Sequence, residues 1–133
     1  MLKSKIKGIR EQILKAAQSV YDMWDQDDEG WSENFQHSGG ICQDIAEAIC
    51  DVLSKNNIDC FTLSASVGEQ HVWSVAIDDA TEEAVSIDIP PCCYETGGGY
   101  TWRKIKDVQF DNSDLIINNE NYEDICLARD SDW

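Results

Sequence analysis

A cysteine, a histidine and an aspartate stand in an order that suits nucleophilic catalysis. Cys42 follows two glycines, Gly39 and Gly40, and begins a stretch with the spacing of an amphipathic helix. A helix N-terminus carries unpaired N–H groups and a partial positive charge, so it favours a thiolate over a thiol. His71 and Asp88 follow in two stretches with strand character. A nucleophilic cysteine needs these side chains as its base and its orienting group, so we predict a Cys42–His71–Asp88 triad.

The hairpin between the two predicted strands decides whether His71 and Asp88 meet. With a tip at residues 79–82, the register brings Trp73 opposite Asp88. Asp88 then lies on the same face as His71, roughly 7–8 Å away diagonally between backbones, which is within reach for a carboxylate and an imidazole. A slip by one residue would put the two side chains on opposite faces. The other histidine, His37, lies in the loop before the glycines, and the strand geometry favours His71.

Three further positions complete the predicted site. The side-chain amide of Gln36 is a candidate oxyanion donor together with the backbone N–H of Cys42, although Gln36 also fits an ordinary loop glutamine. Trp73 and Tyr100 are expected to contact substrate, and Trp73 fits either the wall of the site or the core. Tyr100 lies in the glycine-rich loop 92–101, which is either a lid over the substrate or a flexible surface loop.

Two helices are expected to position these residues. Residues 2–24 predict a helix that covers the core, and residues 41–55 predict a second one whose apolar face carries Cys42 at its edge. The first helix has an apolar stripe at Ile6, Ile9, Ile13, Ala17, Val20 and Trp24.

Downstream the apolar period changes from helical to alternating, which predicts an antiparallel sheet. Its three main strands are expected near 61–67, 70–78 and 84–89, with shorter ones near 106–110 and 114–117. Pro90 and Pro91 end the third strand, because proline cannot donate to a ladder. The fold class is therefore α+β, with N-terminal helices packed on an antiparallel sheet in a single domain over residues 1–133.

The ordered set of motifs resembles the transglutaminase-like branch of the papain-like cysteine peptidase superfamily. The likeness rests on Gly40-Ile41-Cys42 at a helix start, His71-Val72-Trp73 on a strand and Asp88 on the next strand, and it covers about residues 36–90. Gln36 is similar to the glutamine that papain-like peptidases place six residues before the nucleophile. The resemblance implies a papain-like fold with a transglutaminase-like core, and acyl transfer through a thioester.

Two substitutions and a missing region depart from the family pattern. Gln43 stands where papain-like peptidases commonly have Trp, and Asp88 stands where they have Asn. The chain lacks the additional domains of animal transglutaminases, so nothing supports their calcium dependence, and we expect no cofactor. The reaction stays open among peptide or isopeptide hydrolysis, glutamine deamidation and transfer to an amine, with hydrolysis as the default.

The formal net charge of −16 limits the partners. Residues 1–15 carry half of the ten basic side chains, and the remaining 118 residues carry 25 of the 26 acids. Such a surface repels phosphate, so we expect no nucleic-acid binding, and it favours a basic protein or peptide as substrate. The alternative reading is a non-catalytic acidic binding protein on a papain-like fold: an inhibitor, an immunity protein or a nucleic-acid mimic.

The remaining features concern location and the other cysteines. No apolar run approaches the roughly 18 residues that span a bilayer, and lysines interleave with the N-terminal isoleucines. We therefore expect no signal peptide, no membrane contact and a cytoplasmic protein.

The six cysteines are interpreted as thiols, and their spacing does not favour zinc. Cys50, Cys60 and Cys126 are interpreted as buried fillers.

Overall fold

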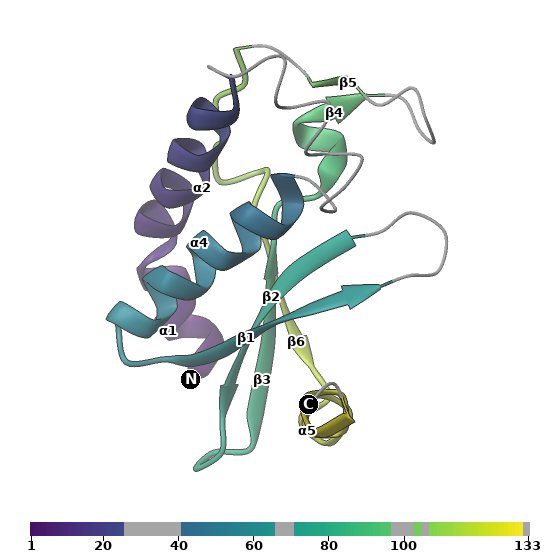
Figure 1. The fold of residues 1–133 in the computed structure, drawn as a ribbon. Helices are drawn as coiled ribbons and strands as arrows, with labels where there is room; N and C mark the ends of the chain where they lie inside the picture. Colours follow the sequence, from purple (N-terminus) through teal and green to yellow (C-terminus); the bar gives the residue numbers. More distant parts are fainter. Residues whose placement is uncertain (26–40, 66–70, 97–102, 105–106, 132–133) are drawn as a thin grey trace.

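The computed structural model describes residues 1–25, 41–65, 71–96, 103–104 and 107–131. In this part of the chain it is an α+β fold of four helices and a four-stranded antiparallel sheet (Figure 1). The helices are α1 (Leu2–Gly8), α2 (Arg10–Asp25), α4 (Ile41–Lys55) and α5 (Tyr122–Ser131). The sheet is formed by β1 (Asp59–Ala65), β2 (His71–Asp78), β3 (Glu83–Asp88) and β6 (Ile116–Glu120).

The predicted helix over residues 2–24 is two helices, which corrects the expectation of one continuous covering helix. The break follows Gly8, and Ile9 has φ −115° and ψ 18°, outside helical values. Gly8 weakens the helix at this point because glycine has the greatest backbone entropy to lose. The predicted stripe is buried at Ile6, Ile13 and Ala17, and Tyr21 joins the core, which the sequence pattern did not indicate.

Helix α4 has the bounds that the sequence predicts. Its apolar stripe packs inward because apolar residues recur every three or four positions. Asn56 and Asn57 end it, and Asn57 adopts a left-handed conformation with φ 60°, which asparagine tolerates. The buried residues of α4 are Ile41, Cys42, Ile45, Ala46, Ile49 and Leu53.

The sheet has the strand order β1-β2-β3-β6, with every neighbouring pair antiparallel. The hairpin between β2 and β3 pairs Asp78 with Glu83 and Val75 with Ser86, which is the predicted register. Its tip is therefore at residues 79–82 as expected, and Glu82 there has φ 56°. The first three strands are thus confirmed within one to two residues where they are described; residues 66, 67 and 70 lie outside the described part.

Apolar side chains cover both faces of the sheet. Helices α1, α2 and α4 gather on one side, and α5 lies on the other (Figure 1). On the first side Ser74 of β2 is fully buried, and its Oγ donates to the Ala46 carbonyl of α4 at 2.7 Å. On the second side Ile125 of α5 packs with Val75 and Ile77 of β2. Helix α4 is therefore held on β2 by packing and by a buried hydrogen bond.

The C-terminal third differs from the expectation. Residues 107–110 of the strand expected near 106–110 form turn and irregular structure. The strand expected near 114–117 is present as β6, which begins two residues later and is the fourth strand of the sheet. After β3 the chain forms a short 3₁₀ helix (Pro91–Cys93) and a separate two-stranded pair, β4 (Glu95–Thr96) with β5 (Arg103–Lys104). Within the described ranges, none of the helices combines the length and the apolar character that crossing a bilayer requires.

Candidate active site

The predicted histidine and aspartate form a hydrogen-bonded pair at the ends of neighbouring strands. His71 is the first residue of β2 and Asp88 the last of β3, and their Nε2 and Oδ2 atoms are 2.7 Å apart. The confirmed register explains the contact: Ser74 pairs with Ile87, so the next step along the ladder brings Asp88 towards the beginning of β2. Both side chains are about three-quarters covered, with exposed fractions of 22% and 24%. A short bond in such a site is a charge-assisted one.

Cys42 approaches the same imidazole from the first turn of α4. It is buried, with 4% of its surface exposed. Since Nε2 bonds to Asp88, Nδ1 is the ring nitrogen left for the thiol, and it is buried without a partner of ordinary hydrogen-bond geometry. The thiol nevertheless lies close enough to the ring to raise the pKa of His71. The thiol–imidazole contact is thus looser than the imidazole–carboxylate bond, as is common in unliganded sites.

These neighbours change the protonation of His71. Burial alone would lower the pKa of the imidazole, but the hydrogen bonds and charges of Asp88 and Cys42 together raise this pKa to about 9. The ring is therefore protonated at neutral pH. Asp88 balances the positive charge of the imidazolium from the Nε2 side.

Trp73 fixes the plane of the imidazole. Its ring stacks on that of His71, with centroids 5.9 Å apart and planes inclined by 22°. The same side chain also packs against the apolar cluster between the sheet and α5. Trp73 is therefore a wall beside His71, in agreement with one of the two roles expected for it.

The structure thus brings together four of the six predicted site residues. Asp88 and Trp73 contact the imidazole ring of His71, and Cys42 lies near enough to raise its pKa. The predicted oxyanion donor Gln36 and the predicted substrate contact Tyr100 lie outside the described residues, as do the glycines before Cys42 and part of the expected lid. The assembled group has the parts for proton transfer to and from a sulfur nucleophile.

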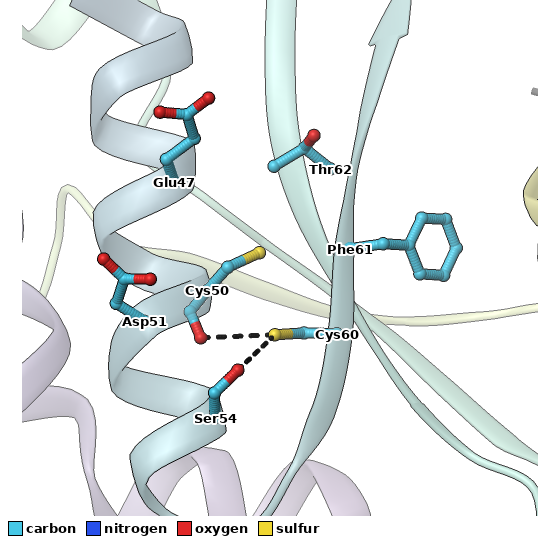
Figure 2. Close-up of a pocket in the computed structure, with 7 residues that line it drawn as sticks. All are labelled: Glu47, Cys50, Asp51, Ser54, Cys60, Phe61 and Thr62. Carbon is cyan, nitrogen blue, oxygen red and sulfur yellow. Dashed lines mark hydrogen bonds between the residues drawn. The ribbon is translucent and has the colours of Figure 1, made fainter.

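Sequence reasoning missed a pair of thiols, one on α4 and one on β1. Cys50 and Cys60 are half-buried and lie beside a cavity of about 590 Å³, so the interpretation of both as buried fillers is wrong (Figure 2). No local signal connects them, since Cys50 belongs to a helix and Cys60 to a strand. The cavity is lined by Glu47, Cys50, Asp51, Ser54, Cys60, Phe61 and Thr62.

The possible metal ligands and three comparisons with known proteins complete the description of the site. Among the described residues, no group of three histidine, cysteine, aspartate or glutamate side chains has an arrangement that would hold a metal ion. No protein-family model matches the chain, and neither a curated protein nor a solved structure matches it. The geometry around His71 is therefore the main guide to function.

Proposed function

We propose that the protein is a cysteine-dependent acyl-transfer enzyme with Cys42 as nucleophile, His71 as acid and base, and Asp88 as the orienting group. One observation carries the proposal: the 2.7 Å bond between His71 and Asp88, with Cys42 on the ring's remaining side. An aspartate on a half-buried histidine fixes the tautomer and the orientation of the ring. The fold proposed for this core is the papain-like one of the transglutaminase-like branch.

The reaction follows from the charges of the three groups. The Cys42 thiolate attacks an acyl carbon, and the His71 imidazolium gives its proton to the departing amine as a thioester forms. Water then attacks the thioester, and the imidazole takes the water's proton while the thiolate leaves. Main-chain N–H groups in the first turn of α4 are proposed to stabilise the oxyanion, with Gln36 as a second donor. The default reaction is hydrolysis of a peptide or isopeptide bond.

The substrate is proposed to be a protein or peptide with basic residues. The net charge of −16 attracts cationic partners and repels nucleic acid. The same charge supports the second candidate, a non-catalytic acidic binding protein. The two candidates differ in what Cys42 does, because a binding protein needs no nucleophile.

The test is acylation by p-nitrophenyl acetate, an activated ester that needs no specific recognition. We expect rapid acetylation of Cys42, located by mass spectrometry, followed by slower release of acetate. His71→Ala should slow the acetylation of Cys42 without changing that of Cys60, which serves as the internal control. If all six cysteines acetylate at equal rates in the folded protein, Cys42 is no activated nucleophile and the binding-protein candidate is preferred.

A further inference from the structure

Cys50 and Cys60 form a pair of thiols where α4 contacts β1. Cys50 lies about two helical turns beyond Cys42 along α4. The Cys60 Sγ lies 3.2 Å from the main-chain carbonyl oxygen of Cys50 and 3.6 Å from the Ser54 Oγ (Figure 2). The sulfur of one cysteine thus reaches the backbone of the other, which places α4 and β1 close together at this point. Both thiols line the cavity, so a small molecule in solution reaches them.

The two thiols have different pKa values. Hydrogen bonds from the Cys50 thiol and the Ser54 hydroxyl stabilise the Cys60 thiolate and lower the pKa of Cys60 to about 7, although burial opposes this. The bond to Cys60 and burial raise the pKa of Cys50 well above its ordinary value. When Cys60 is protonated, its thiol donates to the Cys50 carbonyl instead. The pair therefore holds one reactive thiolate and one protonated thiol.

We propose that Cys50 and Cys60 form a reversible disulfide when hydrogen peroxide enters this cavity. The Cys60 thiolate attacks one peroxide oxygen; an S–O bond forms, the O–O bond breaks, and the departing hydroxide takes a proton to become water. Cys50 then gives up its proton, and its thiolate sulfur attacks the Cys60 sulfur. An S–S bond forms, the S–O bond breaks, and hydroxide leaves with the Cys50 proton as a second water. The two thiols lose two electrons, which reduce one peroxide to two waters.

The lining of the cavity favours a neutral oxidant. Glu47 and Asp51 contribute two carboxylates, and the wider surface is strongly acidic. An anionic disulfide such as oxidised glutathione is repelled by this charge, whereas hydrogen peroxide is not. The same charge attracts cystamine, a dicationic disulfide, so the two disulfides make a matched pair of reagents. This role needs neither His71 nor the proposed acyl transfer.

Peptide mapping of the intact protein tests the proposal directly. The protein is treated with hydrogen peroxide, its remaining thiols are alkylated at acidic pH, and it is cleaved after acidic residues. Cleavage gives separate peptides for residues 48–51 and 60–69, each with one cysteine, and keeps Cys42 in a third peptide. We expect the 48–51 and 60–69 peptides to be joined by a disulfide that a reductant removes. Recovery of both as alkylated thiols, at a peroxide dose that oxidises Cys42, would overturn the proposal.

Two variants separate the roles of the thiols. In Cys50→Ser, Cys60 should stop at the sulfenic acid, which dimedone captures; in Cys60→Ser, Cys50 should stay reduced. Cys126→Ser removes another half-buried cysteine and should leave the linked peptide unchanged. Circular dichroism checks that each variant folds, and the wild-type mapping stands without them. Oxidation of Cys60 to a sulfinic acid beside an unmodified Cys50 would also exclude the disulfide.

With disulfide reagents, cystamine should react with Cys60 at least tenfold faster than oxidised glutathione.

Discussion

Cys42 and Cys50 belong to one helix yet face different partners. Cys42 meets an imidazole that is backed by a carboxylate, whereas Cys50 meets a second thiol. The His71–Asp88 pair accepts a proton and returns it without any change in oxidation state, which is what acyl transfer needs. The thiol pair can instead lose two electrons and form a bond. In our two proposals, the partner side chain, more than the helix, decides the chemistry of each cysteine of α4.

The largest effect is expected from removing the nucleophile. Cys42→Ala should lower the rate of acyl transfer by about 10⁴-fold, because no other group of the site forms the thioester. The steady-state turnover of p-nitrophenyl acetate, followed by absorbance after the single acetylation of the other thiols is complete, measures this rate. The matched variant Cys60→Ser should keep the wild-type rate, and a similar loss in both variants would show that the two thiols do not have separate functions.

Asp88→Asn should have the next largest effect, a loss of about 10³-fold in the same reaction. The amide no longer supports the imidazolium, so the pKa of His71 falls from about 9 and the alkaline limit of activity moves to lower pH. A pH–rate profile, together with NMR titration of the histidine, measures both changes. An unchanged profile would mean that the 2.7 Å bond has only a structural role.

His71 should also make folding stability depend on pH. Its pKa of about 9 in the folded protein exceeds the ordinary 6.5, so the folded state holds the proton more tightly. The contribution is complete below pH 6.5 and is lost as the pH rises through about 9; it amounts to at most about 3 kcal/mol. Urea unfolding between pH 6 and 10 measures it. His71→Gln should flatten this part of the curve, and the Cys126→Ser variant, which keeps both His71 and the Cys50–Cys60 pair, should not.

The smallest effect concerns the bond that holds α4 between the two sites. Ser74→Ala removes the buried 2.7 Å bond to the Ala46 carbonyl and should lower the free energy of unfolding by about 1 kcal/mol. Ser54→Ala, at an exposed position of α4, is the control and should change it by less than about 0.5 kcal/mol. Equal effects in both variants would argue against a special role for the buried bond.

Local sequence patterns predicted the helix bounds and the strand register that depend on nearby residues alone. The bounds of α4 follow from its stripe and from Asn56-Asn57, and the β2–β3 register follows from the length of the hairpin. That register is also why the contact of His71 with Asp88 could be anticipated. Cys42 could be placed at the start of the helix. Its position near the imidazole ring of His71 agrees with the arrangement predicted for the triad.

Other features depend on tertiary packing that no local pattern reveals. The break at Ile9 lets α1 and α2 pack on different partners, and only Gly8 hinted at it. Helix α5 has a weak apolar stripe, and its packing depends on Ile125 against β2. The Cys50–Cys60 contact joins a helix to a strand, so its chemistry could be seen only once the two elements were in place.

The position of α1 has a consequence for the order of folding during synthesis. Leu2 and Ile6 are buried, and α1 contacts β3 and β6, which are made much later. The Leu2 N–H also donates to the Glu83 Oε2 at 3.2 Å. On the ribosome, this helix emerges before β3 and β6 and has its apolar face uncovered until β6 appears. The turns of α1 are therefore made well before the strands that secure them, and the nascent chain is exposed to aggregation over that interval.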